Sequence, residues 1–340
     1  MVVLSLFDGI ACGMAALERA GIHVDKYYAS EIDAAAIAIA QKNYPNIIEL
    51  GNVLDLEYSR SSLPKVDLLI GGSPCTNFSS IGYGNGMCSE TEEITSLDQY
   101  IDLKQRGIQF IGQSFLFWEY VRLLKEVQPK YYLLENVRMA EKWKNLISAT
   151  LGTEPILINS SLVSAQNRPR LYWTNIHEIA PPPDKHILIQ DILDKNADTS
   201  DVSYCKTVQR ALPILIKKYG YIPEMFNAYN ASIINGKAPT LSRGSMVTSS
   251  CATLIFVQLE CGVHTVQSNI LDEKYPTKLK DGRYNIRKLN LKEMERLQTL
   301  PDDYTLAEGI SNQKRSNAIG NGWTVDVIAH ILSYLPIKRA

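Results

Sequence analysis

The stretch Asp67-Leu-Leu-Ile-Gly-Gly-Ser-Pro-Cys75 is a short apolar run that ends in two glycines, a serine, a proline and a cysteine. Such a run predicts a buried strand followed by a tight turn. In open α/β sheets, ligands bind just beyond the carboxyl ends of the strands. Cys75 would therefore stand at a binding edge, where a neighbouring cation or helix N-terminus would make its thiolate a nucleophile. Burial as a small apolar residue is the ordinary alternative for a single cysteine.

The composition sets the broad class of protein. The chain has 340 residues, 45% hydrophobic and 21% charged, which is typical of a soluble protein with one large and one smaller domain. The net charge of -1 gives no overall attraction to nucleic acid, so any basic surface must be local. The six cysteines contain no CxxC pair, so we expect neither a metal site nor a disulfide framework. We find no signal peptide and no membrane-spanning stretch, and therefore expect a reduced, cytoplasmic location.

The N-terminal segment has the pattern of a nucleotide-binding fold. A β-type run at 2–6 leads into a turn with Gly9 and Gly13 and then into an alanine-rich helix at 14–20. Glycine lets the backbone approach a ligand, and a helix N-terminus favours negative charge. The spacing G-x-x-x-G differs from the dinucleotide pattern G-x-G-x-x-G and argues against NAD.

Acidic residues follow or end two of the predicted strands. Glu31 comes after a strand at 26–30, where a carboxylate can accept hydrogen bonds from a ribose; a helix-capping acid is the equal alternative. Glu135 lies in the apolar strand 131–137, where an unpaired carboxylate is costly, so we expect a function for it. The other expected elements are strands at 47–50, 66–70, 154–164 and 170–173 and helices at 33–43, 115–127, 139–151 and 325–335. A further helix within 287–302 is expected to be capped at Asn290 and stopped by Pro301. A second glycine turn is expected at 317–325, before the last helix.

The segment 82–112 lacks a clear period and contains five glycines. Because a long structureless loop directly after a nucleophile is often mobile, we predict a lid here.

A local basic region lies beyond the run Pro181–Pro183, which marks a domain boundary. Between Ser203 and Leu259, six basic residues and one acid give a local charge of +5, and 239–250 is rich in Ser and Thr. Basic, hydroxyl-rich loops suit phosphate contacts and base-edge readout, although an ordinary polar domain has the same composition.

Taken in order along the chain, these motifs resemble those of the cytosine-C5 DNA methyltransferases. The amino-acid sequences of the motifs are most similar to those of the branch that contains animal de novo methyltransferases and their phage and bacterial relatives. The resemblance implies an α/β fold with a Rossmann-like mixed seven-stranded sheet, a catalytic domain at 1–180 and 286–340, and a target-recognition domain at 181–285. The motifs that carry it are Phe7-x-Gly9 with Gly13, Glu31, Pro74-Cys75, Glu135-Asn-Val, Gln166-x-Arg168-x-Arg170, Arg287 through Asp302, and Gly320-Asn321-Gly.

The resemblance also implies the roles of individual residues in methyl transfer to C5 of a flipped-out cytosine in double-stranded DNA. Cys75 would attack C6, Glu135 would hold and protonate the N3 edge, and Arg168 would bind the O2 edge. Arg170 would support the loop. The S-adenosylmethionine pocket would be lined by Phe7, Asp8, Gly9, Ile10, Glu31, Ile32, Asn52, Val53, Ser73, Asn321, Trp323 and Val325.

Three features separate this chain from common members of that family. Asn52 stands where an acid commonly contacts the adenine amino group, Ala11 and Cys12 replace glycine in the first turn, and the segment after Cys75 is longer than usual. An amide oxygen can accept the same hydrogen bond, so S-adenosylmethionine stays the expected cofactor.

Two alternatives to this function stay open from the sequence alone. An RNA cytosine-C5 methyltransferase would share the chemistry, but that branch carries a Cys-Phe-Thr stretch that this chain lacks. A binding protein without turnover would have lost Cys75, Glu135 or Arg168, and all three are present. We expect a monomer of a prokaryotic cell or phage with double-stranded DNA as its partner; whether a restriction enzyme accompanies it stays open.

Overall fold

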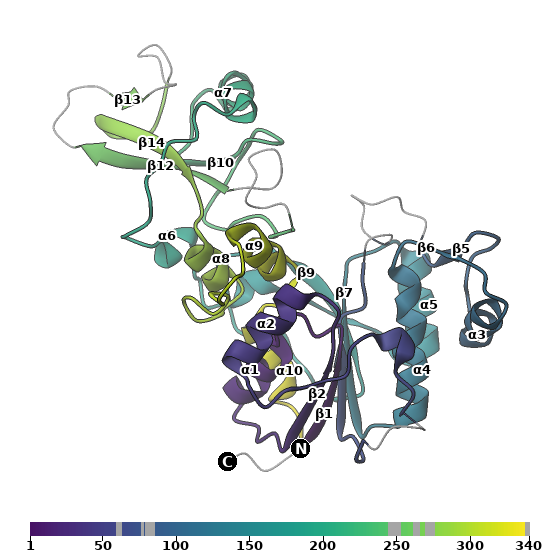
Figure 1. Ribbon diagram of the computed structural model, residues 1–340. Helices are drawn as coiled ribbons and strands as arrows, with labels where there is room; N and C mark the ends of the chain where they lie inside the picture. The colour runs from purple at the N-terminus through teal and green to yellow at the C-terminus, as the bar shows by residue number, and fades with distance from the viewer. Residues whose placement is uncertain are drawn as a thin grey trace. The chain divides into compact units, whose positions relative to one another are not determined.

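The computed structural model in Figure 1 describes residues 1–58, 63–75, 78, 86–243, 253–260, 266–268 and 276–336. The chain divides into two compact units, which we describe separately. Unit 1 comprises Met1–Asn159, Pro169–Pro182 and Val325–Ala340, and unit 2 comprises Ser160–Arg168 and Pro183–Thr324.

Unit 1 is built on a seven-stranded mixed sheet with the strand order β3-β2-β1-β4-β7-β9-β8. Strands β1, β2, β3, β4 and β7 pair in parallel, whereas β9 is antiparallel to both of its neighbours. The sequence prediction of a mixed seven-stranded sheet is therefore confirmed. The strands are β1 (Val2–Leu6), β2 (Lys26–Ser30), β3 (Ile48–Glu49), β4 (Leu68–Gly71), β7 (Tyr131–Val137), β8 (Ile156–Asn159) and β9 (Pro169–Thr174).

Helices cover both faces of this sheet (Figure 1). One face carries α1 (Cys12–Arg19), α2 (Ala34–Asn43) and α10 (Val325–Leu332), and the other carries α4 (Phe117–Val127) and α5 (Glu141–Leu151). A parallel sheet that is buried on both faces needs apolar residues at every position, which is why the central strands read as continuous apolar runs.

The expected structureless loop is wrong for the described part of 82–112, whereas its motion as a lid stays a prediction. Residues 86–112 contain β5 (Cys88–Ser89), helix α3 (Leu97–Gln105) and β6 (Phe110–Ile111), and 82–85 lie outside the described residues. Helix α3 begins at the N-cap Ser96 and buries Leu97, Tyr100 and Leu103 in the core of unit 1. This three-residue spacing stands among glycines and acids, which made the helix hard to recognise in the sequence.

Unit 2 contains a five-stranded sheet with the order β11-β10-β12-β14-β13, packed against helix α7 (Lys206–Tyr219). Its strands are β10 (Met225–Asn227), β11 (Ser232–Ile233), β12 (Thr253–Glu260), β13 (Val266–Ser268) and β14 (Gly282–Lys288). A second core joins the 160–168 segment to α6 (Ile189–Ile192), α8 (Leu291–Leu297) and α9 (Asn312–Asn321). Residues 286–324, predicted with the catalytic domain, therefore pack within unit 2.

The helix predicted near the C-terminus has the predicted start: Asn290 caps α8, which begins at Leu291 and ends at Leu297, before Pro301. Arg287 belongs to β14. It donates twice to the buried carboxylate of Glu293, at 2.8 and 2.7 Å, and this pair joins strand to helix. The glycine turn predicted at 317–325 needs correction, because 317–321 lie in α9. No helix among the described residues has the length and apolar character that would let it cross a membrane.

Candidate functional site

Cys75 and Glu135 lie at the same edge of the sheet of unit 1. Strands β4 and β7 are parallel neighbours with Gly71 opposite Leu134, so Glu135 and the Pro74-Cys75 loop both follow this pair. The side chain of buried Asn136 donates to the backbone oxygen of Ser73 at 3.2 Å and to its hydroxyl at 3.1 Å. Asn136 therefore fixes the start of the cysteine loop against the strand that carries Glu135.

Asn136 was missed in the sequence reading, although an amide beside a carboxylate in an apolar strand was the signal that could have found it. Its bonds also give Ser73, which was predicted to line the cofactor pocket, a role in holding the loop.

Glu135 forms an ion pair with Arg170 of β9, with 3.0 Å between Oε1 and Nε. The two side chains are 11% and 13% exposed, so both charges are largely withdrawn from water. Pairing offsets the cost of burying each charge and fixes a carboxylate and a guanidinium side by side near the end of β7.

Arg168 has different surroundings, because it belongs to unit 2. Its buried guanidinium donates to the backbone oxygens of Leu241, Gly320 and Gly322 at 2.8, 3.2 and 2.9 Å. Arg168 thus joins three segments of unit 2. The role predicted for it at the cytosine O2 edge stays a prediction. Within unit 1, Glu135 pairs with Arg170.

The turn after β1 has an unusual backbone. Phe7, Gly9 and Ala11 all have positive φ angles, of 57°, 64° and 59°. The left-handed region costs a non-glycine residue roughly 1 to 2 kcal/mol, so Phe7 and Ala11 are strained. Strain of this kind persists where surrounding structure enforces it and is concentrated at functional sites.

Glu31 connects this turn to the start of α2. Its Oε2 accepts from the backbone N–H of Gly9 at 2.9 Å, and its Oε1 accepts from Ile32 and Asp33 at 2.7 and 2.9 Å. The alternative considered from the sequence, that Glu31 caps the helix, is wrong, because the N-cap of α2 is Asp33, which accepts from Ala35 N–H at 2.9 Å. A carboxylate offers about four acceptor positions, so these bonds leave room for a ribose hydroxyl.

The remaining predicted cofactor residues of unit 1 differ in exposure. Ile32 is 69% exposed beside Glu31, as expected for a side chain that would cover an aromatic ring. Asn52 caps a short 3-10 helix, η1 (Val53–Asp55), by accepting from Leu54 N–H at 3.1 Å. Ile10, Val53 and Val325 are buried in the core, so their side chains serve packing. Asn321 and Trp323 belong to unit 2.

Two carboxyl groups near this turn have buried oxygens without a hydrogen-bond partner among the described residues. They are Asp8 Oδ2 and Glu49 Oε2. Burial raises the pKa of Asp8 to about 6, although its Oδ1 accepts a hydrogen bond from the Tyr27 hydroxyl at 2.6 Å. Burial, followed by the charges of Asp8 and Glu31, raises the pKa of Glu49 to about 7. A cofactor with a positive charge fits this arrangement, because it would compensate these carboxylates.

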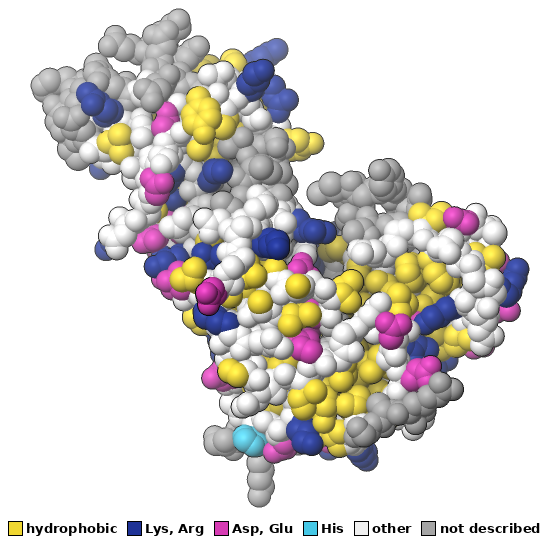
Figure 2. Space-filling view, viewed as in Figure 1, with side chains coloured by type: hydrophobic (Ala, Val, Ile, Leu, Met, Phe, Trp, Pro, Cys, Tyr) yellow, Lys and Arg dark blue, Asp and Glu magenta, His cyan; other side chains and the backbone are white. Residues whose placement is uncertain are grey.

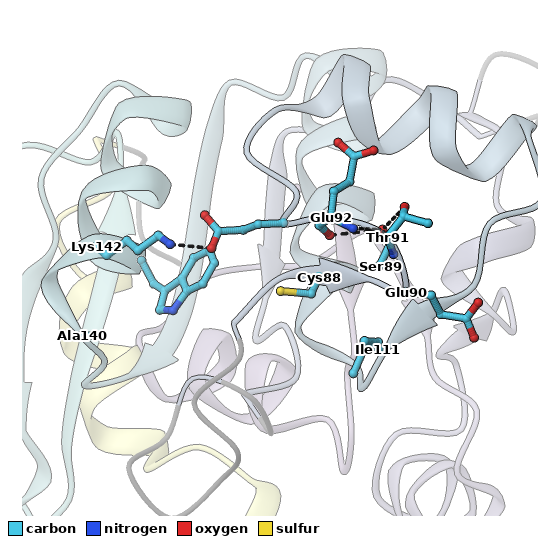
Figure 3. Close-up of a pocket in the computed structure, with 10 residues that line it drawn as sticks. Cys88, Ser89, Glu90, Thr91, Glu92, Ile111, Ala140 and Lys142 are labelled. Atoms are coloured by element: carbon cyan, nitrogen blue, oxygen red, sulfur yellow. Dashed lines mark hydrogen bonds and ion pairs between the residues drawn. The ribbon is translucent and has the colours of Figure 1, made fainter.

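A separate hollow of about 620 Å³ lies between the β5–β6 hairpin and the start of α5 (Figure 3). Its wall includes Cys88, Glu93 and Lys142, and the Lys142 ammonium pairs with the Glu93 carboxylate and lies 4.8 Å from the Trp143 ring centre. None of the predicted site residues lines this hollow, so it is distinct from the sheet edge described above. The described residues contain no group of three or more His, Cys, Asp or Glu that would hold a metal ion.

Comparison with known proteins gives a family and several relatives. The family model of C-5 cytosine-specific DNA methylases matches residues 1–336. The orphan methyltransferase M.Rho11sI of Bacillus phage rho11s is 33% identical over 192 residues, which cover 52% of this chain and 33% of that protein. The orphan methyltransferase M.SPRI of Bacillus phage SPR is 34% identical over 192 residues, covering 52% and 38%. The chain thus spans little more than a third of these two curated relatives.

Solved structures share the fold over nearly the whole chain. The methyltransferase EhMeth of Entamoeba histolytica has a TM-score of 0.65 at 14% identity, covering 98% of this chain and 97% of that one. The Dnmt2 methyltransferase of S. pombe has a TM-score of 0.62 at 17% identity, covering 98% of each. At these identities the likeness concerns the fold.

The raised pKa of Asp8 predicts how stability depends on pH. The folded state holds the Asp8 proton more tightly than the unfolded chain, so the free energy of unfolding should fall as pH rises from about 4 to about 6. Asp8→Asn cannot ionise and should lose this part of the fall, so it gains stability relative to wild type towards pH 7. Urea unfolding of the ligand-free protein across this range measures the difference, with exposed Asp98→Asn as control. Parallel profiles for wild type and Asp8→Asn would contradict the prediction.

Proposed function

The chain belongs to the C-5 cytosine-specific DNA methylases, and from this we propose that it transfers a methyl group from S-adenosylmethionine to C5 of cytosine in double-stranded DNA. The observation that carries the proposal is the loop of Cys75, tied by Asn136 to the strand that presents the Glu135–Arg170 pair. This is the set of groups that the reaction needs: a nucleophile, a proton-sharing carboxyl and a fixed cation.

The chemistry follows from the weakness of cytosine C5 as a nucleophile. We propose that the Cys75 thiolate adds to C6 while Glu135 hydrogen-bonds the N3 edge and shares a proton there. The electrons of the ring then become available at C5, as in an enamine. S-adenosylmethionine supplies an electrophilic methyl group when bound. C5 takes the methyl group, and S-adenosylhomocysteine is the product that leaves. Loss of the C5 proton to a base and departure of the Cys75 thiolate from C6 then restore the aromatic ring.

We assign the cation at the O2 edge to Arg170, because Arg170 is the arginine paired with Glu135. A guanidinium held in place before the reaction stabilises charge that develops on the ring without reorganising. Arg168 then serves chiefly to hold unit 2 together through its three carbonyl contacts.

The cofactor would be held at the carboxyl ends of β1, β2 and β3. Asp8 would face a positively charged group, Glu31 would accept from the ribose, and Ile32 would lie against the adenine. Asn52 would contact the edge of the adenine.

The substrate base must leave the DNA duplex, because C6 of a stacked cytosine cannot be reached by a side chain. Extrusion costs a few kcal/mol, which contacts with the DNA must offset. The sequence prediction that 239–250 reads base edges falls largely on residues 244–250, which lie outside the described ranges.

Helix α7 offers a surface for the DNA backbone. It carries four cations and no acid, and its outward residues Lys206, Arg210, Lys217 and Lys218 are exposed. Figure 2 shows Lys and Arg side chains gathered around this helix. Lys237, which contributed to the basic count, is not part of this surface, because its ammonium donates to the backbone oxygens of Ser161, Ser164 and Ile187. We propose that α7 contacts phosphates.

Replacing the nucleophile tests the reaction directly. Cys75→Ser should reduce methyl transfer to duplex DNA by about three orders of magnitude or more, because a serine hydroxyl is a far weaker nucleophile at neutral pH. DNA binding should persist. Tritiated-methyl incorporation measures transfer, and Cys88→Ser, a part-buried cysteine of β5, is the matched control that should stay active. Full activity of Cys75→Ser, or transfer to RNA but not to duplex DNA, would overturn the proposal.

Substitutions of Arg168 and Arg170 should change different quantities, the free energy of unfolding for Arg168 and kcat for Arg170. Arg168→Gln leaves buried carbonyls unsatisfied and should lower the free energy of unfolding by about 2 to 4 kcal/mol, with little loss of kcat in the folded protein. Arg170→Gln should lower kcat by about 100-fold or more. Urea unfolding and steady-state kinetics measure both. A loss of kcat confined to Arg168→Gln, with unchanged stability, would restore Arg168 to the O2 edge.

The salt dependence of DNA binding tests the role of α7. Each lost phosphate contact should reduce the slope of log K against log salt by about 0.9, so the triple variant Lys206→Gln, Lys217→Gln, Lys218→Gln should bind DNA with a shallower slope. Exposed lysines of unit 1 give the control, Lys42→Gln, Lys125→Gln, Lys130→Gln. Equal slopes for the two triple variants would show that α7 does not contact the DNA backbone.

A further inference from the structure

A fully buried carboxylate lies outside the groups assigned to the reaction. Glu119 of α4 has no exposed side-chain surface, and three residues donate to it. Its Oε1 accepts from the Tyr100 hydroxyl at 2.5 Å and from the Lys104 ammonium at 2.7 Å, whereas its Oε2 accepts twice from Arg122, at 2.8 and 2.6 Å. The charge of Glu119 is thus compensated, as burial requires.

The donors come from two separate parts of the chain. Tyr100 and Lys104 lie on α3, within the segment that is longer than usual after Cys75, whereas Arg122 lies on α4. Burial, followed by the nearby Glu119 charge, raises the pKa of Tyr100, so its hydroxyl stays protonated and donates. Stacking of Phe110 on Phe115, at 4.6 Å between ring centres, holds the end of this segment close to the start of α4.

The same two cations also hold the loop that follows Asn52. The Lys104 ammonium donates to the backbone oxygen of Leu54 at 3.3 Å. Arg122 Nη2 donates to the backbone oxygens of Val53 and Leu56 at 3.3 and 2.8 Å. Three of the four carbonyl groups of residues 53–56 are therefore bound by cations whose positions Glu119 fixes.

Within this loop, Leu54 N–H donates to Asn52 Oδ1 at 3.1 Å, Asp55 N–H to Asn52 O at 3.1 Å and Leu56 N–H to Val53 O at 3.4 Å. These local bonds shape the turn. Among the described residues, the loop is located by the burial of Val53 and Leu56 in the core of unit 1 and by the Ser30 hydroxyl, which donates to the Gly51 oxygen at 2.7 Å. Lys104 and Arg122 add the cationic contacts that hold its carbonyl groups.

We propose that Lys104 is a positioning residue for the cofactor: with Glu119 and Arg122, it sets the place of the loop 52–56 that contacts the adenine. This inference rests on the proposed function. This role would also explain the long segment after Cys75, because its helix α3 carries the Lys104 ammonium that binds the Leu54 carbonyl. Lys104 is the informative member of the cluster, because its side chain is 38% exposed, whereas Glu119 and Arg122 are built into the core.

The test compares Lys104→Met with wild type and with three further variants, at Lys104, Tyr100 and Arg106. Methionine keeps most of the apolar stem and removes the ammonium. The affinity for S-adenosylhomocysteine, measured by calorimetry, and the KM for S-adenosylmethionine should each weaken by about tenfold, the size expected for one lost charge-assisted hydrogen bond. The kcat and the affinity for duplex DNA should stay within about twofold. Amide hydrogen exchange at residues 54–56 should become faster.

Lys104→Arg should recover most of the affinity, because it restores a cation at the same place. Arg106→Met is the control: its exposed guanidinium pairs with Asp102 of α3, and its removal should leave cofactor affinity and amide exchange at 54–56 unchanged. Tyr100→Phe removes one donor to Glu119 and should weaken cofactor binding by a smaller factor.

The outcomes separate this inference from the proposed function. If wild-type protein binds no S-adenosylhomocysteine, the proposed function fails. If wild type binds and Lys104→Met binds equally well, with unchanged amide exchange at 54–56, the positioning role alone is refuted. An equal loss of cofactor binding, kcat and DNA binding in Lys104→Met would show general destabilisation and would also refute it.

Discussion

Parallel pairing of β1, β2, β4 and β7 is the constraint from which the candidate site follows. Parallel neighbours end at the same edge of a sheet, so residues distant in sequence meet there whenever each follows its strand. Asp8 follows β1, Glu31 follows β2, Cys75 comes shortly after β4, and Glu135 lies near the end of β7. The hydrophobic cost of exposing any of these strands holds the arrangement in place, since both faces of the sheet are covered.

Polar side chains next to this edge fix the positions of the turns and loops that form it. Asn136 ties the cysteine loop to β7, Glu31 ties the turn after β1 to the start of α2, and Glu119 orients the cations that hold the loop after Asn52. Each is a polar side chain that binds backbone atoms or cations of a neighbouring segment. The strained φ angles of Phe7 and Ala11 lie in one of these fixed turns, and the surrounding bonds keep them there.

The sequence predicted the parts of this structure that depend on local patterns. The strands 2–6, 26–30 and 131–137 have the predicted bounds because predominantly apolar runs are followed by a glycine turn or by charged residues. Helix α3 was missed because its three core residues stand among acids and glycines. Strand β14 was missed because the strand and helix pattern beyond Pro183 is unclear from the sequence. A local sequence pattern does not show which group a polar side chain contacts. Arg168 and Arg170 are two residues apart and equally basic, and only the coordinates show carbonyls around one and a carboxylate beside the other.

The pairing of buried carboxylates with cations indicates where a charged ligand would bind. Burying a carboxylate is costly unless a cation or several donors compensate it. Four buried glutamates obey this rule: Glu119 has Lys104 and Arg122, Glu135 has Arg170, Glu293 has Arg287, and Glu295 has Arg315. Asp8 and Glu49 depart from it within the described ranges, because each has one oxygen that is buried without a hydrogen-bond partner, and burial raises the pKa of both carboxyl groups. A chain that compensates four buried glutamates with its own cations, and leaves these two carboxyl groups near the ends of β1 and β3, has the charge arrangement expected for a site that takes its cation from a bound cofactor.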